Sequence, residues 1–345
     1  YKRDSHLQRS PLTMMQRTWV RMLLAISSVI LVLGLGTFLV AKDRYQRQGP
    51  LQQTKTIIVE KGASVVKIAS YLLQSSVIDN AIIFRLGVQY YGMTAKLRAG
   101  EYAIPVGASM QSVAVIIASG KTVKRRLTIA EGLLSVQIVE AIRAAPGLKG
   151  EIPKSALKEG VFLPETYFYS YGDTRVALLL RMRQKLKNEL TRIWAQRSAG
   201  SLLQSSGDAL VLASIIEKET GKSAERAHIS GVFYNRLRHG MALQSDPTVA
   251  YGVTMGKSIL KRPLTKADLR TISPFNTYLN RGLPPAPISN PGVAAIRAAV
   301  LPIKTFDLYF VADGTGGHAF ARTLRAHNRN VARWRKLRKK SRDKN

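Results

Sequence analysis

The stretch DALVLASIIEKETGKSAERAHISGVFYNRLRHGMALQSDPTVAYG, residues 208–252, contains two predicted helices and the polar segment that follows them. Asp208 is expected to cap a first helix that continues to Thr220. A second helix is predicted over residues 223–240, and residues 243–248 then form a polar loop. Polar side chains on a loop behind two packed helices suit hydrogen bonding to a hydroxyl-rich ligand.

One acidic side chain of this stretch points toward the core. Glu217 shares a helical stripe with Leu210, Ala213 and Ser214, so its carboxyl group lies on the apolar face. Glu219 lies about 200° further around the helix and is expected to face water. Burial raises the pKa of a carboxyl group, which suits a general acid at neutral pH. The alternative is that Glu217 is exposed at the rim of the core or forms a salt bridge with an arginine.

Several blocks of the chain together resemble the YceG-like, MltG-type family of endolytic transglycosylases of bacterial cell walls. In order, the blocks are TIAEG (128–132), GVFLPETY (160–167), IIEKET (215–220), VFYNRL (232–237), LQSDPTVAYG (243–252), SPFNTY (273–278), GLPPAPISNPG (282–292) and YFVADGTGGHAF (309–320). Many blocks in one order are far more specific than any single motif. Phe275 and Ala286 stand where the family commonly has Tyr and Gly, which affects only loop details.

The resemblance implies cleavage of the β-1,4 bond between N-acetylmuramic acid and N-acetylglucosamine within a glycan strand, which leaves a 1,6-anhydromuramoyl end. The family is associated with the termination of nascent peptidoglycan strands. One carboxyl group suffices: Glu217 would protonate the departing oxygen and then accept the proton of the C6 hydroxyl as it attacks C1. Because the substrate supplies this nucleophile at high effective concentration, no second carboxylate is required.

Polar side chains in the matching blocks are candidates for binding the sugar hydroxyl and N-acetyl groups. They are Asn235, Gln244, Asp246, Asn276, Tyr278, His318 and Glu165. Each has an ordinary alternative: Asp246 can begin a helix, Glu165 can cap a turn, and His318 can be structural after its glycine-rich turn. Asn290 is expected to be structural, as the N-cap of a helix.

The N-terminal region predicts a membrane anchor. Residues 1–21 carry five basic side chains, and residues 22–41 carry no charge. A 20-residue helix spans the roughly 30 Å hydrocarbon core of a bilayer. The basic residues predict a cytoplasmic N-terminus and a periplasmic catalytic domain in the bacterial inner membrane, although basic residues just beyond residue 41 weaken this bias. A cleaved signal peptide is the alternative, which the long apolar stretch and the lack of a small-x-small cleavage site disfavour. The chain starts at Tyr1 without an initiator Met, so the sequence is expected to be a fragment.

The remaining sequence predicts an α+β fold in two parts. Residues 46–126 resemble the small LysM-like module that precedes the catalytic domain in this family, for which glycan binding and a spacer role both stay open. Its predicted strands are 56–60, 99–104 and 122–129, and its predicted helices are 64–74, 80–91 and 109–119. The resemblance implies that residues 127–332 form the mixed α/β YceG-like catalytic domain. Helices are predicted at 133–145 and 174–196, and a hairpin within 308–322. Residues 333–345 are a basic tail, expected to be frayed or to lie on an anionic surface.

The charge and the cysteine content of the chain limit the classes of function that it can have. Lys and Arg outnumber Asp and Glu by 53 to 21, giving a net charge of +32. This charge would suit a nucleic-acid binder, but the predicted membrane anchor and the blocks that resemble a cell-wall enzyme argue against that function. Anionic lipids and the carboxylates of peptidoglycan are other binding partners for the positive charge. The chain has no cysteine, and its histidines lack metal-ligand spacing, so no thiol chemistry, metal or cofactor is expected.

The expected partners are peptidoglycan glycan strands, inner-membrane lipids, and penicillin-binding proteins or other cell-wall synthases; no nucleic acid is expected. Two alternatives to a lytic transglycosylase stay open. A hydrolytic muramidase would use Asp246 or Glu165 as a second carboxylate. A non-enzymatic cell-wall binding or assembly protein would tolerate Glu217→Gln.

Overall fold

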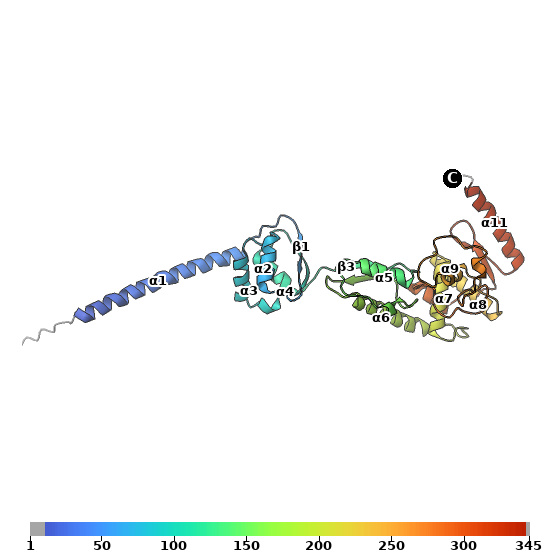
Figure 1. The fold of residues 1–345 in the computed structure, drawn as a ribbon, viewed down its shortest axis with the longest axis horizontal. Coiled ribbons are helices and arrows are strands. Elements are labelled where there is room, and N and C mark those ends of the chain that lie inside the picture. The colour runs from blue at the N-terminus through green and yellow to red at the C-terminus, as the bar shows by residue number, and fades with distance from the viewer. Residues whose placement is uncertain (1–10, 343–345) are drawn as a thin grey trace, which may run out of the picture. The chain divides into compact units, whose positions relative to one another are not determined.

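The computed structural model describes residues 11–342, and the chain divides into two compact units, Tyr1–Val123 and Lys124–Asn345 (Figure 1). We call them the N-terminal unit and the C-terminal unit. Both combine helices with short antiparallel strand pairs, so the expected mixture of α and β structure is confirmed. The boundary after Val123 lies close to the expected division after residue 126.

Helix α1 (Pro11–Gln46) contains the uncharged stretch that was expected to cross a membrane. From Thr18 to Gln46 this helix is long and apolar enough to do so by length and composition. Its side chains are exposed over residues 18–40, and only its end joins a core, where Tyr45 is buried. The expectation of one N-terminal apolar helix is therefore confirmed.

The rest of the N-terminal unit is a two-stranded sheet with three helices. Strand β1 (Lys55–Val59) pairs antiparallel with β2 (Gly100–Ile104), and the helices are α2 (Val65–Gln74), α3 (Ala81–Tyr90) and α4 (Met110–Ser119). The side chains of Ser64, Asn80 and Ser109 cap these helices by accepting hydrogen bonds from first-turn N–H groups. All five elements agree with the predicted ranges to within one residue.

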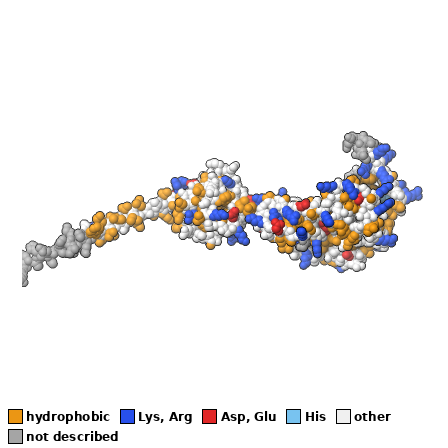
Figure 2. All heavy atoms as spheres, in the orientation of Figure 1, with side chains coloured by type: hydrophobic (Ala, Val, Ile, Leu, Met, Phe, Trp, Pro, Cys, Tyr) orange, Lys and Arg blue, Asp and Glu red, His pale blue; other side chains and the backbone are white. Residues whose placement is uncertain are grey.

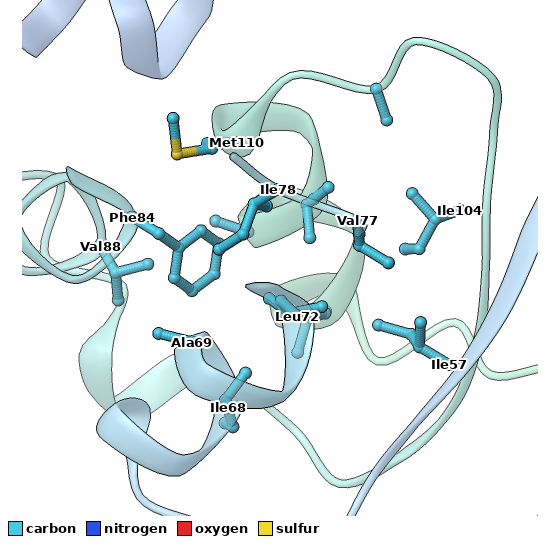
Figure 3. Packing of buried hydrophobic residues seen from close by; sticks show 14 of the residues in the cluster. Ile57, Ile68, Ala69, Leu72, Val77, Ile78, Phe84, Val88, Ile104 and Met110 are labelled. Atoms are coloured by element: carbon cyan, nitrogen blue, oxygen red, sulfur yellow. The ribbon is translucent and has the colours of Figure 1, made fainter. Parts of the chain in front are cut away.

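Apolar side chains from all five elements fill the core of this unit. Figure 3 shows Phe84 and Val88 of α3 facing Ala69 and Leu72 of α2, with Ile57 of β1 nearby. The core is the reason why the helices form, since helices of ten residues are marginal alone in water. The likeness of this unit to a LysM module stays a prediction.

The C-terminal unit has two strand pairs and seven helices within residues 124–342. Strand β3 (Arg125–Thr128) pairs antiparallel with β4 (Thr166–Tyr169), and β5 (Tyr309–Ala312) pairs antiparallel with β6 (His318–Ala321). The helices are α5 (Ser135–Ala144), α6 (Arg175–Trp194), α7 (Ser206–Glu219), α8 (Arg226–Arg238), α9 (Asp246–Thr254), α10 (Val293–Val300) and α11 (Leu324–Arg342).

Helix α7 lies at the centre of the larger core of this unit. Seven of its residues are buried, and it packs against α6, α8, α9 and α10. The segment before α10 is also bound to it, because Ile288 N–H donates to Ser214 Oγ at 3.0 Å and Ser289 Oγ donates to the Ser214 carbonyl at 3.2 Å. The C-terminal end of α7 is therefore held in place from several sides.

Several helix starts differ from the expectations. The helix predicted over 223–240 is α8, which begins three residues later, and two further differences change the role of a named residue. Helix α7 begins earlier than predicted, with Ser205 as its N-cap, and Asp208 is the third helical residue, which closes a capping box with Ser205. Asn290 is structural as expected, but Gly292 is the N-cap of α10. The Asn290 side chain instead accepts from Phe162 N–H and donates to the Leu133 carbonyl, each at 3.0 Å.

Three other segments also need correction. The strand expected at 122–129 is shorter, and it belongs to the C-terminal unit because β3 pairs with β4. Residues 243–248 are not one loop: α9 begins at Asp246 with proline in its first turn, so the helix alternative is confirmed. The basic tail is helical as far as Arg342 rather than frayed, and the last three residues lie outside the described chain.

Candidate active site

Two glutamates at the end of α7 lie in different surroundings. Glu217 is in the last turn of the helix, and Glu219 is its final residue. Thr220 then leaves the helix in an extended conformation. The two carboxyl groups therefore face different neighbours, and these neighbours decide what each group can do.

Glu217 is almost completely enclosed, with a side chain only 4% exposed. One carboxyl oxygen accepts from Arg226 Nη2 and the other from the N–H of Gly292, both at 2.8 Å. Arg226 also donates to Glu131 at 3.1 Å. Burial raises the pKa of Glu217 and the charge of Glu131 adds to this shift, whereas the Gly292 N–H and Arg226 oppose it by stabilising the ionised form. The predicted burial of Glu217 is confirmed, and so is the alternative of an ion pair with an arginine: Arg226 pairs with one oxygen, and the Gly292 N–H binds the other.

Glu219 does not face water as expected; its side chain is half-buried beneath the segment that leads into α9. The hydroxyl of Ser245, itself buried, donates to Glu219 Oε1. Burial raises the pKa of Glu219 to about 7, the Ser245 hydrogen bond opposes this shift, and the charge of Asp246 adds to it. Near neutral pH this carboxyl group therefore exists in both protonation states, which is the condition for a group that must give and take a proton.

Three of the predicted sugar-binding residues surround Glu219. The Tyr278 hydroxyl donates to Asp246 Oδ1 at 2.6 Å. Besides Asp246, the side chains of His318 and Arg236 act electrostatically on Glu219, and both lower its pKa. Polar groups from the α8, α9 and β6 regions thus converge on the end of α7.

His318 is itself fixed by an acidic partner. Its Nδ1 lies 2.8 Å from Glu225 Oε2, and its backbone N–H donates to Glu225 Oε1 at 3.0 Å. Burial alone would raise the pKa of Glu225, but the hydrogen bonds from His318 outweigh it and lower that pKa. The ring also meets Phe310 edge-on, with centroids 5.4 Å apart. These contacts hold the imidazole in one orientation beside Glu219.

Arg236 positions the segment that carries Ser245. Its guanidinium donates to the carbonyls of Leu243 and Leu308, each at 2.7 Å. Gln244 follows with a backbone φ of 53°, and its N–H donates to the Thr277 carbonyl at 3.1 Å. Gln244 is exposed beside the cluster, and its Oε1 accepts from Arg236 Nη1 at 3.5 Å.

The other candidates have structural partners. Asn235 donates to the carbonyls of Thr305 and Asp307, at 2.8 and 3.0 Å. Asn276 is buried and donates to the carbonyls of residues 269 and 271, at 3.0 and 2.9 Å. Glu165 pairs with Lys185 of α6 at 2.5 Å, with both side chains well exposed. The structure does not bring these three side chains to Glu219.

A groove lies next to this cluster. It has a volume of about 330 Å³ and is lined by α9 and by residues of the segment 258–264, with Lys218 and Asp246 among the lining residues. Its wall is mostly apolar, from side chains such as Pro247, Tyr251 and Ile259. A groove with an apolar wall and a few polar groups is the usual form of a ligand site.

Reasoning from the sequence missed Glu219 and Ser245. Helical periodicity placed Glu219 on the outer face, but periodicity describes only the helix, and this residue is covered by a segment more than twenty residues later. The signal available in the sequence was the second glutamate of IIEKET together with the serine of LQSDPT, both in blocks that carried the resemblance.

Comparison with known proteins places these residues in a family. The model of the YceG-like family matches residues 57–333. The chain is 32% identical over 330 residues to the endolytic murein transglycosylase of Bacillus subtilis, covering 87% of this chain and 90% of that protein. It is 29% identical over 320 residues to the endolytic murein transglycosylase of Streptococcus pneumoniae, covering 80% of this chain but only 58% of that longer protein.

A solved structure is also similar. The crystal structure of a YceG-like protein from Listeria monocytogenes has 32% sequence identity and a TM-score of 0.47, covering 80% of this chain and 99% of that one. The family match extends from β1 of the N-terminal unit into α11 and includes both glutamates of α7 and every residue described around them. The chain belongs to the YceG-like family.

Proposed function

We propose that this protein is an endolytic murein transglycosylase in which Glu219, rather than Glu217, is the general acid and base. It cleaves the β-1,4 bond between N-acetylmuramic acid and N-acetylglucosamine within a glycan strand and leaves a 1,6-anhydromuramoyl end. The activity is supported by the Bacillus and Streptococcus relatives, which are named endolytic murein transglycosylases. The observation that carries the choice of residue is the polar cluster around Glu219, which raises its pKa to about 7.

The two oxygens of Glu219 have different roles in this proposal. Oε1 accepts from Ser245, and Oε2 has no hydrogen-bond partner within residues 11–342. Oε2 carries the proton and donates it to the glycosidic oxygen as the C1–O bond breaks. Both oxygens of Glu217 are engaged by Arg226 and Gly292, so that carboxylate has no oxygen left for a substrate.

The second half of the reaction returns the proton. The Glu219 carboxylate accepts the proton of the C6 hydroxyl while O6 bonds to C1, so the muramoyl ring closes on itself and no water is consumed. The nucleophile is part of the substrate, which gives it a high effective concentration. The enzyme ends the cycle with Glu219 protonated, as it began.

Asp246 supports this chemistry with its charge. Tyr278 holds one of its oxygens at 2.6 Å, so the carboxylate has a fixed position beside Glu219. Its negative charge raises the pKa of Glu219 and also favours the positive charge that develops at C1 in the transition state. Gln244, Tyr278 and His318 stay as the proposed sugar-binding side chains, whereas Asn235 and Asn276 position loops.

The location of the protein in the cell and its binding partners are also part of the proposal. Helix α1 anchors the chain in the bacterial inner membrane, with the N-terminus cytoplasmic and the C-terminal unit periplasmic. The N-terminal unit acts as a LysM-like module, and penicillin-binding proteins or other synthases of nascent glycan are the partners. These proposals rest on the apolar helix and on the order of the family blocks.

Product analysis tests the activity. The full chain is incubated in detergent with purified peptidoglycan, beside its Glu219→Gln variant, and the products are weighed by mass spectrometry. Anhydro ends, lighter by one water than reducing ends and absent with the variant, support the proposal. Reducing ends would indicate a hydrolytic muramidase that uses Asp246 as a second carboxylate. Products of either kind at the same rate from the variant would contradict the role of Glu219.

A further inference from the structure

Within the N-terminal unit, helix α3 lies alongside the last part of the apolar helix α1. The rings of Phe38 and Tyr90 meet edge-on with centroids 5.6 Å apart, and Tyr45 packs so closely on Gly87 that a Cβ there would lie 2.3 Å from its ring. A groove of about 610 Å³ separates the two helices elsewhere. It is lined on the α1 side by Gly34, Thr37, Phe38, Ala41, Lys42 and Tyr45.

The position of this contact along α1 matters because of the length of the apolar stretch. Crossing a hydrocarbon core of about 30 Å takes about 20 residues, and a tilted helix needs more. Arg21 precedes the uncharged residues 22–41 and Lys42 follows them, so these 20 residues are the segment of α1 that can cross the bilayer core. The hydrocarbon must therefore include Gly34 to Ala41, a length of about 10 Å along the helix axis.

Helix α3 presents an apolar stripe beside this same part of α1. Ile82, Leu86 and Tyr90 are spaced four residues apart and are 65%, 57% and 67% exposed, while Phe84 and Val88 on the opposite side are buried in the core. Figure 2 shows hydrophobic side chains along α1 and on the adjoining part of the N-terminal unit. Arg85 is exposed within the same helix.

We infer that α3 is an interfacial helix, whose residues Ile82, Leu86 and Tyr90 insert into the periplasmic leaflet of the phospholipid bilayer beside α1. The inference rests on the proposed membrane anchor. A helix with an apolar face typically sinks about 5–10 Å into the boundary of headgroups and acyl chains. Lys42, which directly follows the uncharged stretch, can meet anionic headgroups at the end of the hydrocarbon core. The N-terminal unit is then attached to the membrane by both α1 and α3, and not by α1 alone.

A fluorescent probe at a single cysteine tests this contact. The chain has no cysteine, so Leu86→Cys gives one labelling site, at a side chain that is exposed and not part of the buried core. Thr56→Cys is the matched control, because Thr56 is an exposed residue of β1. Figure 1 shows β1 on the side of the N-terminal unit away from α1. Each full-length variant is labelled with an environment-sensitive dye and reconstituted in vesicles of phosphatidylethanolamine and phosphatidylglycerol.

The inference predicts that the dye at residue 86 emits at shorter wavelength, is quenched by nitroxides on the acyl chains, and is several-fold less accessible to iodide than the dye at residue 56. Equal iodide quenching at both sites, in protein that resists carbonate extraction, overturns the inference and leaves the anchor intact. Protection from iodide without quenching by lipid nitroxides means that a second copy of the chain covers α3, which also overturns it. Loss of the whole chain from the vesicles overturns the anchor and this inference together.

Discussion

The hydroxyl of Ser245, directly before α9, donates a hydrogen bond to the carboxyl group of Glu219, the last residue of α7. This contact joins two of the blocks that carry the family resemblance, IIEKET and LQSDPTVAYG. It places Glu219 under cover, beside Asp246, and two residues away from a second glutamate whose oxygens are both occupied. We propose on this basis that Glu219 has the chemical role and Glu217 a structural one, although only one residue lies between them in the sequence.

The pH dependence of activity should move in opposite directions in two variants. The Ser245 hydrogen bond lowers the pKa of Glu219 and the charge of Asp246 raises it. Activity needs protonated Glu219, so it should fall as the pH rises through about 7. Ser245→Ala should shift this alkaline limb to higher pH, and Asp246→Asn should shift it to lower pH. Rates of anhydro-end formation between pH 5 and pH 9 measure both, and shifts in the same direction would contradict the assignment.

Asp246→Asn also tests the number of carboxylates in the mechanism. If one carboxyl group is sufficient, this variant stays active, and its highest rate is found at a lower pH than that of the native chain. Complete loss of turnover at every pH, equal to that of Glu219→Gln, would instead indicate a second essential carboxylate.

The ion pair of Glu217 should matter for stability. Arg226→Met leaves Glu217 buried without its cation, and breaking a buried pair in this way costs about 3–5 kcal/mol. Arg192→Met is the matched control, because Arg192 pairs with Glu189 on the exposed face of α6, where such pairs contribute only about 0–1 kcal/mol. Urea unfolding of the full chain in detergent measures both changes. An equal loss of unfolding free energy in the two variants would mean that the Glu217–Arg226 pair contributes no more to stability than an exposed pair.

Glu219 should destabilise the fold at alkaline pH. Its pKa is raised to about 7 in the folded chain, so the folded state binds more protons than the unfolded state between the ordinary pKa of 4.5 and 7. Stability contributed by this group is therefore present below that window and is lost as the pH rises through it. Glu219→Gln should raise the free energy of unfolding at pH 8 relative to the native chain and change it much less at pH 4. A variant that is less stable at pH 8 would contradict the raised pKa.

Glu165 should be dispensable for catalysis. It pairs with Lys185 on the surface of the C-terminal unit, and no described interaction joins it to Glu219. Glu165→Gln should therefore keep the native rate of anhydro-end formation, measured on the same peptidoglycan. A loss approaching that of Glu219→Gln would restore Glu165 as a second acid.

Much of the secondary structure could be predicted because its signals are local. Ser64, Asn80 and Ser109 mark helix starts that the structure places one residue later, and α6 lies within the predicted range of 174–196. The strand at 122–129 was harder, since its length and its unit depend on β4, about forty residues away.

The site was less predictable because its contacts join distant residues. Helical spacing could show that Glu217 is buried, but it could not show that Arg226 and Gly292 occupy both of its oxygens. Nor could spacing show that Ser245 folds back over the last residue of α7. The family blocks indicated the segments that carry the candidate site, and the packing between them is the basis for our choice between the two glutamates.

The most direct test of this distinction compares Glu217→Gln with Glu219→Gln in the same assay. Both full-length variants are first checked for folding by circular dichroism at a temperature well below the unfolding transition, and the initial rate of anhydro-end formation is then measured at pH 6. The account predicts that Glu219→Gln loses about 10²–10⁴-fold in rate, the usual contribution of a general acid and base. Folded Glu217→Gln should keep most of the native rate. The opposite order, with Glu219→Gln active and folded Glu217→Gln inactive, would contradict the account and return the catalytic role to Glu217.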